Sequence, residues 1–501
     1  MDMVNSLLFC KEERNTRVLD ERIPYQLSLD HSFSYICADS KKRERFLSVV
    51  SDWIDDAETI TYRREILGDF CNNPSLLAEL LSLTARWEEL RLSHKSGERT
   101  EYRLRAERNT SLTSAKNILQ SEALACRRAL LFIKAYGEML SAYDLQSRGL
   151  TAFRDACREM YAHKEFSNML AFCAQYQNFS ASGFLDFKFT LSEEGRIAQY
   201  EWINHRYIHV SDPELKKSGF TLFKKTQEAV HPCVRIYPPA DGFFDNLAVC
   251  ALTELSRIFS SVFEQITVRL GNLCADLDFY DTACQYIHAL EAKKIPYCYP
   301  GFSANNCVRV HKLYDLYLLV TKASPSEVVP NDVEMTGESG GVLVFGDNGS
   351  GKTVYLRSIG TMQVLAQAGL PIPGERAEIP LFSQIGAQFS EAEKEFCEGN
   401  EAGRFEQEVR ELSKMVDTLQ EGALVFLNET FQSTAYAEGA EGLYHLLKHF
   451  SDSGIRWILV SHLRRLESMF AHGDATVLHM AEGYALQNSS AGEPCHQRER
   501  D

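Results

Sequence analysis

A phosphate-binding loop is the feature that most constrains this chain. The eight residues from Gly346 to Thr353 fit the pattern G-x-x-x-x-G-K-[ST], and the apolar stretch Gly341–Phe345 before them predicts the strand that such a loop follows. Strand, glycine-rich loop and helix in this order are typical of a parallel α/β sheet that binds a nucleotide. The alternative, an ordinary glycine turn between a strand and a helix, leaves the full eight-residue match unexplained.

The residue types in this loop each have a chemical reason. Glycines let successive backbone N–H groups turn toward a β-phosphate, Lys352 supplies a positive charge to the β and γ oxygens, and the Thr353 hydroxyl can bind Mg²⁺. The helix that starts near Thr353 presents its amino end to the same anion. The residues predicted to hold ATP or GTP in this loop are Gly346, Asp347, Asn348, Gly349, Ser350, Gly351, Lys352 and Thr353.

A second apolar run, residues 424–427, ends in Asn428 and Glu429 and predicts a strand whose end lies beside the phosphates. The usual order at this place is Asp then Glu, where the first residue supports Mg²⁺ and the second orients or deprotonates water. Asn428 brings no negative charge, so we expect weaker Mg²⁺ binding and slower turnover. The candidate metal-binding residues are Thr353, Asn428 and Glu429, and Glu429 is also the candidate base.

A third apolar run, Trp457 to Ser461, delivers His462 to the place where a sensor of the γ-phosphate would lie. A histidine at a strand end can also be purely structural. His462 follows the phosphate loop and the second strand in the expected order, which favours its role as a sensor of the γ-phosphate. The candidate catalytic residues are therefore Glu429, Lys352 and His462.

Length and composition narrow the class of protein. The chain has 501 residues, enough for two to four domains with apolar cores. Its 14 cysteines include no C-x-x-C pair, and the first residues lack a signal sequence, which together predict reduced thiols in a cytoplasmic protein. No apolar run approaches the roughly 20 residues that span a bilayer, so no membrane role is expected.

The formal net charge of −16 argues against indiscriminate nucleic-acid binding but leaves room for local basic surfaces. Residues 86–108 mix basic and acidic side chains at a density that favours a solvated helical face over a nucleic-acid contact. Residues 196–225 instead combine basic and aromatic side chains, which favours a contact with DNA. The candidate DNA-contacting residues are Arg196, Arg206, Lys216, Lys217, Lys224 and Lys225, among the rings of Tyr200, Trp202, Tyr207 and Phe220.

The patterning along the chain predicts four segments. Residues 1–58 carry no recognisable chemistry, and residues 59–330 have strong helical periodicity, interrupted at about 184–237 by alternation typical of a β-rich insertion. Residues 331–485 alternate strands and helices, and 486–501 form a polar tail. The strands expected in the third segment are residues 341–345, 424–428, 456–460 and 475–479.

Several separated motifs together resemble the MutS family of DNA mismatch-repair ATPases, over about Thr61 to Gly483. Thr61–Phe70 resembles the start of that family's helical core, and Asp278-Phe279-Tyr280 is similar to a later core segment. Val329–Val333 resembles the V-P-N-D stretch before the phosphate loop. The resemblance implies an α+β multidomain fold, with a helical core and lever domain, a β-rich clamp insertion and a P-loop domain of ABC-ATPase type. It also implies that Val329 and Asn331 form the adenine side of the pocket.

Beyond the loop, residues 403–408 resemble the family's S-T-F-x-x-E segment, and residues 429–434 resemble its E-L-G-R-G-T run. Ser461-His462-Leu463 is similar to its T-H-x switch. The resemblance implies composite nucleotide sites in a homodimer, with contacts to the partner from Gly403, Arg404, Ser433 and Thr434. Gly403 stands where the family usually has Ser, so this position offers no hydroxyl for the contact across the dimer.

Two absences limit what the resemblance implies. Residues 1–58 contain no F-x-E motif of the kind with which the family reads mismatches. The stretch after Met480 is too short for the nuclease domain that some relatives append. The chain would then grip DNA without reading a mismatch.

Three functions remain in competition. The first is a homodimeric clamp on double-stranded DNA, including mismatched or branched DNA, that ATP and Mg²⁺ control. The second is an ATP-dependent scaffold whose long helices bind protein partners, which the overall acidity favours. The third is a degenerate ATPase that keeps nucleotide as a structural cofactor, which Asn428 and Gly403 favour.

Overall fold

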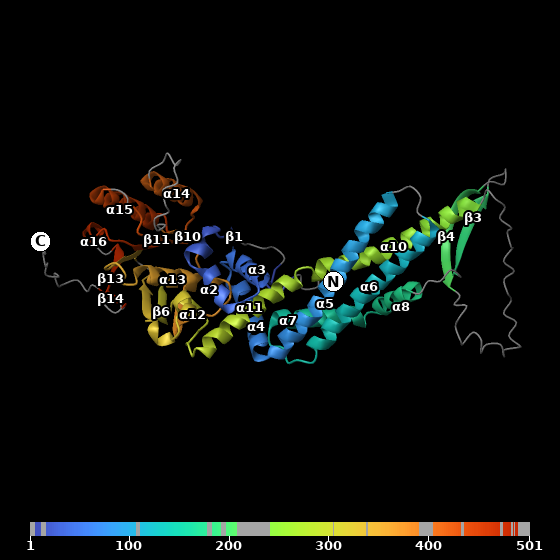
Figure 1. Ribbon diagram of the computed structural model, residues 1–501, viewed down its shortest axis with the longest axis horizontal. Coiled ribbons are helices and arrows are strands. Elements are labelled where there is room, and N and C mark those ends of the chain that lie inside the picture. Colours follow the sequence, from blue (N-terminus) through green and yellow to red (C-terminus); the bar gives the residue numbers. More distant parts are fainter. Residues whose placement is uncertain are drawn as a thin grey trace. The chain divides into compact units, whose positions relative to one another are not determined.

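The computed structural model shows a chain of helices and sheets (Figure 1). It describes residues 6–11, 17–106, 111–177, 183–191, 197–207, 241–303, 305–336, 339–389, 404–431, 435–470, 474–481, 484 and 486–488. In residues 95–106, 183–191, 197–207, 241–245, 404, 407, 487 and 488 only the backbone is described. None of the helices within these residues is long and apolar enough to cross a membrane.

The chain divides into two compact units. We call the first, Ala78–Leu145 with Leu150–Cys274, the helical unit. The second, the sheet unit, comprises Ser6–Leu77, Gln146–Gly149 and Ala275–Asp501. The segment for which the sequence predicted no chemistry, residues 1–58, thus contributes its described part to the sheet unit.

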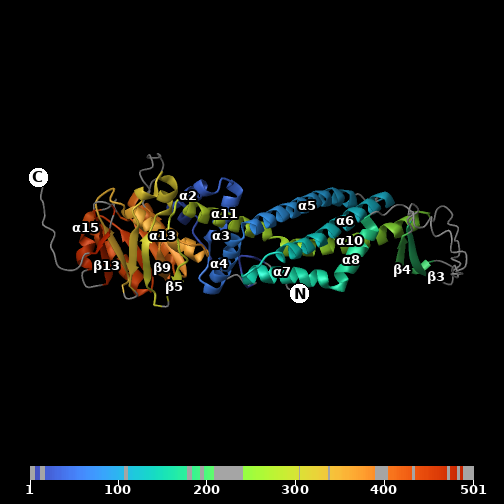
Figure 2. The same ribbon diagram turned by 90° about the horizontal axis from the view of Figure 1, so that it is seen from below.

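Long amphipathic helices build the helical unit, and α6 packs against α8 and α10, as Figure 2 shows. The apolar positions of α6 recur every three or four residues, which places them on one buried face. Aromatic side chains fill the space between helices: Trp87 lies edge-on to Phe132, and Phe259 packs against Phe172 and Tyr176. The helices are α5 (Pro74–Ala106), α6 (Leu112–Leu140), α7 (Arg148–Ala162), α8 (Lys164–Gln177) and α10 (Asp241–Leu270).

A two-stranded antiparallel sheet falls inside the predicted β-rich insertion. It consists of β3 (Gly183–Leu191) and β4 (Ile197–Tyr207), with register irregularities after Asp186 and Thr190. The rest of the insertion, residues 208–237, lies outside the described residues. The strands agree with the predicted alternation, and the assignment of this insertion as a clamp stays a prediction.

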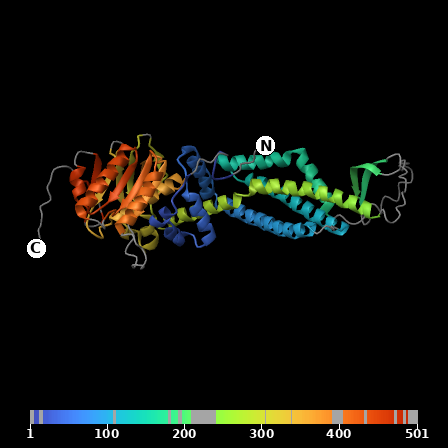
Figure 3. The ribbon, with the colours of Figure 1, turned by 90° about the horizontal axis from the view of Figure 1, so that it is seen from above.

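A sheet forms the centre of the sheet unit, and most of its strands are the orange arrows of Figure 3. It has six strands in the order β10-β11-β12-β8-β13-β14. The first five strands pair in parallel and β14 is antiparallel to β13. The four predicted strands are confirmed to within one residue at each end, whereas β10 was not predicted. The strands are β8 (Gly341–Phe345), β10 (Gln384–Phe389), β11 (Ala423–Asn428), β12 (Arg456–Val460), β13 (Ala475–Met480) and β14 (Leu486–Asn488).

Helices follow the parallel strands, because parallel neighbours must be joined by a crossover connection. They are α13 (Lys352–Gln367), α14 (Arg404–Thr418), α15 (Tyr436–Asp452) and α16 (Arg465–Met469). A smaller four-stranded sheet in the order β5-β9-β6-β7 accompanies them. Its strands are β5 (Gly301–Phe302), β6 (Val308–Leu313), β7 (Asn331–Met335) and β9 (Arg376–Ile379).

The part of the sheet unit that precedes residue 78 is helical and packs on the large sheet's own elements: α1 contacts β10 and α3 contacts α13. Trp53 donates to the carbonyl of Phe382 at 2.9 Å, and the buried Gln367 at the end of α13 donates to the carbonyl of Ile54 at 2.6 Å. The remaining helices and strands are β1 (Arg17–Val18), α1 (Arg22–Gln26), α2 (Leu29–Ile36), α3 (Ser40–Ser51), β2 (Asp52–Trp53), α4 (Ala57–Asn72), α11 (Leu273–Ala292) and α12 (Leu316–Thr321).

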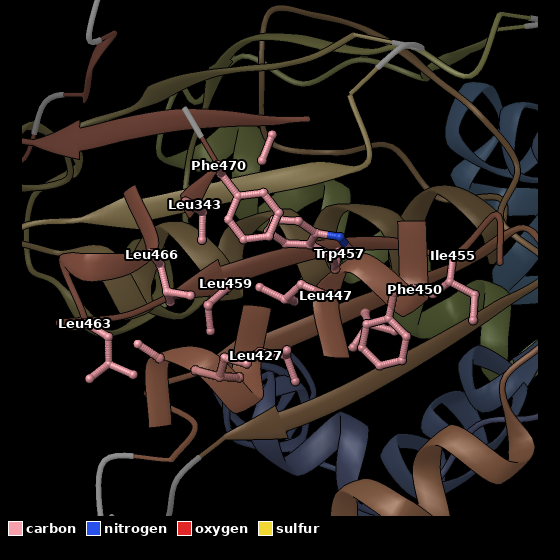
Figure 4. Close-up of a cluster of buried hydrophobic side chains, with 14 of the residues drawn as sticks. Leu343, Leu427, Leu447, Phe450, Ile455, Trp457, Leu459, Leu463, Leu466 and Phe470 are labelled. Atoms are coloured by element: carbon pink, nitrogen blue, oxygen red, sulfur yellow. The ribbon is translucent and has the colours of Figure 1, made fainter. Parts of the chain in front are cut away.

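The apolar core of the sheet unit gathers side chains of the large sheet with side chains of α14, α15 and α16. Figure 4 shows part of this cluster. Trp457 of β12 is fully buried there, and its ring occupies the space beside Gly341, where a Cβ would lie 2.2 Å from the ring. Only glycine fits at the start of β8 for this reason. The labelled members of this core in Figure 4 are Leu343, Leu427, Leu447, Phe450, Ile455, Trp457, Leu459, Leu463, Leu466 and Phe470.

Candidate nucleotide-binding site

The predicted phosphate loop connects β8 to α13 at the carboxyl edge of the large sheet. Gly349 and Gly351 have φ values of 79° and 100°, a left-handed backbone that other L residues rarely adopt. Gly351 is the residue that caps the amino end of α13, where unpaired backbone N–H groups and the helix dipole favour an anion. The backbone thus has the form that a phosphate-binding loop requires.

Lys352 is buried at the beginning of α13, with 4% of the residue exposed. Its Nζ donates hydrogen bonds to the carbonyl oxygens of Gly346 at 2.8 Å and Asp347 at 2.9 Å. Burial lowers the pKa of this lysine, because removal from water penalises the charged form. The ammonium is therefore held inside the loop, where an incoming phosphate can replace the carbonyl partners.

Thr353 and Asn428 join the first turn of α13 to the end of β11. The Thr353 hydroxyl donates to Oδ1 of Asn428 at 3.1 Å, and Asn428 is 8% exposed. Oxygen donors of this kind suit Mg²⁺, but both are neutral. A metal ion here would need negative charge from other groups, and the nearest carboxylate along the chain is that of Glu429.

Glu429 and His462 meet at the ends of β11 and β12. Oε1 of Glu429 and Nε2 of His462 lie 3.0 Å apart, and the two side chains are one quarter and one third exposed. The Glu429 N–H also donates to the carbonyl of Val460 at 2.8 Å, which ties the residue to β12. A carboxylate held by a histidine beside a phosphate loop can position a water molecule for attack.

The turn that follows β11 has a strained backbone. Glu429 and Phe431 have φ values of 57° and 64°, although neither is glycine. Such a conformation costs about 1–2 kcal/mol per residue. The buried Thr430 hydroxyl donates to Oε1 of Gln388 at 2.8 Å, and the Phe431 N–H donates to Oε2 of Glu408 at 3.1 Å. Strain of this kind clusters at functional sites, where the surrounding structure maintains it.

Gln388 is a site residue that the sequence analysis missed. It lies near the end of β10, beside β11, and is 6% exposed. The only available signal was a glutamine that follows the short apolar stretch Ile385 to Ala387. That signal is weak, because the same pattern occurs at many strand ends.

Asn331, predicted to form the adenine side of the pocket, holds a neighbouring segment of backbone. Its Nδ2 donates to the carbonyl of Tyr484 at 3.0 Å, and its Oδ1 accepts from the N–H of Leu486 at 3.1 Å. The ring of Tyr484 lies next to the phosphate loop, 3.2 Å from where a Cβ on Gly351 would be. Val329 is 42% exposed and available to a ligand.

Several predicted residues lie outside the described part of the chain. For Arg404 and Arg206 the structure describes only the backbone, at the start of α14 and in β4. The roles assigned to all these positions remain predictions. The residues outside the described ranges are Gly403, Ser433, Thr434, Arg196, Lys216, Lys217, Lys224 and Lys225.

One further group of possible metal ligands occurs among the described residues, formed by Cys10, Asp56 and Glu58. Asp56 already accepts from the backbone N–H groups of Glu58 and Thr59 as the cap of α4, and Glu58 pairs with Lys11 at 2.8 Å. Helix capping and a surface ion pair account for this group.

Comparisons with known proteins find one matching family model and two groups of named relatives. Residues 342–488 match the family described as MutS domain V. The chain is 26% identical over 213 residues to DNA mismatch repair protein MutS of Lactobacillus delbrueckii subsp. bulgaricus, which covers 42% of this chain and 23% of that protein. It is 25% identical over 275 residues to the MutS of Lactobacillus helveticus, covering 52% and 31%.

A second group of relatives has a different name. The chain is 30% identical over 161 residues to Endonuclease MutS2 of Brevibacillus brevis, covering 32% of this chain and 20% of that protein. In these three comparisons the matched part thus spans less than a third of the relative's own length.

Proposed function

We propose that this chain, which belongs to the MutS family as its separated motifs predicted, is an ATPase that grips double-stranded DNA as a homodimeric clamp. ATP binding would close the clamp and hydrolysis would release it, in mismatch repair or a related form of DNA processing. The observation that carries the proposal is the convergence of Lys352, Thr353, Glu429 and His462 at one edge of a parallel sheet.

In this proposal Lys352 exchanges its two carbonyl partners for the β and γ oxygens of ATP. The Thr353 hydroxyl, the Asn428 amide oxygen and the Glu429 carboxylate are oxygen donors that fit Mg²⁺. When bound there, Mg²⁺ would neutralise phosphate charge.

Glu429 would orient and deprotonate the attacking water. His462 hydrogen-bonds to Glu429 and lies at the end of the neighbouring strand, so it can exchange that bond for one to the γ-phosphate. This exchange would free the carboxylate at the moment when nucleotide is in place.

The DNA half of the proposal is supported by the basic and aromatic sequence of residues 196–225. Phosphate contacts by these side chains would make affinity fall with salt. Charge reversal at Lys216, Lys217, Lys224 and Lys225 should reduce both the affinity and its salt dependence. A matched control reverses four exposed lysines of the sheet unit: Lys41, Lys322, Lys414 and Lys448.

The decisive experiment measures binding of the purified protein to homoduplex, mismatched and branched DNA, with and without ATP, across a salt titration. Nucleotide-dependent binding that the four-lysine reversal weakens and the control leaves intact is the expected result. Absence of DNA binding at low salt would contradict the clamp and direct the search to protein partners.

One observation favours a second candidate, a degenerate ATPase that keeps nucleotide as a structural cofactor. Asn428 is neutral where a carboxylate is usual, and it faces Thr353 in a neutral pair. Measured ATP turnover that disappears in Glu429→Ala would exclude this candidate. Tight nucleotide binding without turnover in the wild type would establish it.

A further inference from the structure

The turn of residues 429–431 contains two left-handed residues, Glu429 and Phe431, that are not glycine. In the family pattern E-L-G-R-G-T the third position is glycine, and here it is Phe431. Glycine adopts a φ of this sign without steric cost, whereas phenylalanine does not. This chain therefore needs contacts that hold the turn.

Those contacts come from α14 and β10. Glu408, on the second turn of α14, is 8% exposed, and its Oε2 accepts the N–H of Phe431 at 3.1 Å. The rings of Phe405 and Phe431 lie 5.3 Å apart. On the other side of the turn, Thr430 is fully buried and donates to Gln388.

The direction of the Glu429 carboxylate depends on this turn. Glu429 lies two residues before Phe431, and its carboxylate reaches His462 at 3.0 Å. If Phe431 relaxed to a right-handed φ, the chain after Glu429 would rotate and the N–H of Phe431 would leave Glu408. A hydrogen bond from a backbone N–H to a carboxylate is one of the stronger kinds, and a buried carboxylate deprived of it loses a needed donor.

We propose that Glu408 is a positioning residue for ATP hydrolysis: its carboxylate holds the Phe431 amide and so keeps Glu429 aligned for water activation. The inference rests on the proposed ATPase function and deepens it, because it assigns Glu408 a task within its own subunit. Glu408 touches neither the nucleotide nor the water in this proposal.

Four variants test the assignment: Glu408→Ala, Glu408→Gln, Phe431→Gly, and the double variant Glu408→Ala with Phe431→Gly. Glu408→Ala should lower kcat about tenfold, the equivalent of about 1.4 kcal/mol in activation free energy, with nucleotide affinity unchanged. Glu408→Gln keeps an acceptor oxygen and should retain most of kcat. In the Phe431→Gly background, Glu408→Ala should cause no further loss, because glycine holds the turn unaided.

The matched control is Glu406→Ala, on the same helix, where the exposed carboxylate pairs with Arg410 across one helical turn. This change should leave kcat and nucleotide affinity as they are. Thermal unfolding of every variant shows whether the fold survives. A fully folded Glu408→Ala protein with wild-type kcat would overturn the assignment, as would an equal loss of kcat in the Phe431→Gly background.

Hydrogen exchange of the backbone amides of residues 429–431 gives a readout independent of activity. Glu408→Ala should speed exchange at Phe431, and Glu408→Gln should restore protection. If the wild type hydrolyses no ATP, the proposed function fails, and exchange alone then decides whether Glu408 holds the turn. Unchanged exchange in Glu408→Ala would overturn the inference.

Discussion

Lys352 and Arg456 are two buried cations at opposite ends of the same parallel sheet, and both bond to backbone carbonyls. Lys352 stands at the carboxyl edge, and its acceptors lie five and six residues earlier in its own loop. Arg456 stands at the amino end of β12 and donates to the carbonyls of Asn306, Thr336 and Ser339, at least 117 residues away. Burial lowers the pKa of both side chains.

The difference between them lies in what each cation holds together. The acceptors of Lys352 belong to a glycine loop at the amino end of α13, where the helix dipole also favours an anion. A phosphate can take the place of these carbonyls at little cost in structure. The acceptors of Arg456 belong to separate segments of the chain. In the contacts described, no other cation donates to these carbonyls, so the charge of Arg456 stabilises the fold.

The largest effect is expected from Lys352→Ala. Nucleotide affinity should fall about 100-fold or more, because charge-assisted hydrogen bonds contribute about 1.5–3 kcal/mol each. The melting temperature without nucleotide should not fall, since burial penalises this cation. Titration with a fluorescent ATP analogue and thermal unfolding measure the two quantities. Lys448→Ala, at an exposed position, is the control, and an affinity within threefold of wild type would remove Lys352 from the site.

The second-largest effect is expected from Arg456→Met, and it concerns stability instead of nucleotide affinity. The free energy of unfolding should fall by about 2–3 kcal/mol, because buried carbonyls lose their donor. Nucleotide affinity of the folded protein should remain unchanged. Denaturant unfolding and the same nucleotide titration test both statements. The control is Arg309→Met. Arg309 forms an exposed ion pair with Glu378 at an N–O distance of 3.9 Å, so its loss should change stability by less than about 1 kcal/mol.

Asn428→Asp adds a negative charge to the carboxyl edge of the sheet, near Lys352, and leaves the amino edge with Arg456 unchanged. The Thr353 hydroxyl can donate to the new carboxylate as it does to the amide. The Mg²⁺ concentration that half-saturates ATP hydrolysis should fall about tenfold, the equivalent of about 1.4 kcal/mol. Asn428→Ala is the control and should raise this Mg²⁺ concentration. A Mg²⁺ requirement that Asn428→Asp leaves unchanged would place the metal away from β11.

The smallest effect concerns pH. Because the folded state lowers the pKa of Lys352 below its ordinary value of 10.5, the native protein releases this proton before the unfolded chain does. In the window between the two pKa values the unfolded state binds more protons, so stability gains with rising pH. Wild type should gain stability relative to Lys352→Met as the pH approaches 10.5 from below. Urea midpoints of the two proteins at several pH values measure this, and a constant difference would contradict it.

The sequence predicted most of the strands that end at the nucleotide-binding site, but it did not predict the contacts between their residues. The apolar runs of β8 and β12 have the bounds that their patterns predicted, because buried parallel strands consist of continuous apolar residues. β10 was missed, since glycine and two glutamines interrupt its apolar pattern. The helices of residues 22–51 were missed as well, because short helices depend on packing more than on local propensity.

The individual contacts of the site join segments that are far apart in the chain. Glu429 meets His462 over 33 residues, Phe431 meets Glu408 over 23, and Thr430 meets Gln388 over 42. No periodicity or motif carries that information. The resemblance to a family pointed to the right segments, but it offered no partner for Phe431 and no role for Glu408.

By itself the sequence determined a nucleotide loop and four of the strands around it, because these depend on residues that are neighbours in the chain. Its separated motifs also indicated the resemblance to the MutS family, with which residues 342–488 agree. Only the tertiary structure decided that Lys352 and Arg456 have opposite tasks, that Asn331 holds backbone, and that the turn after β11 is strained and held by α14. The physical reason is that a hydrogen bond requires two groups about 3 Å apart in a fixed direction. Folding alone brings such groups together when they are distant in the chain.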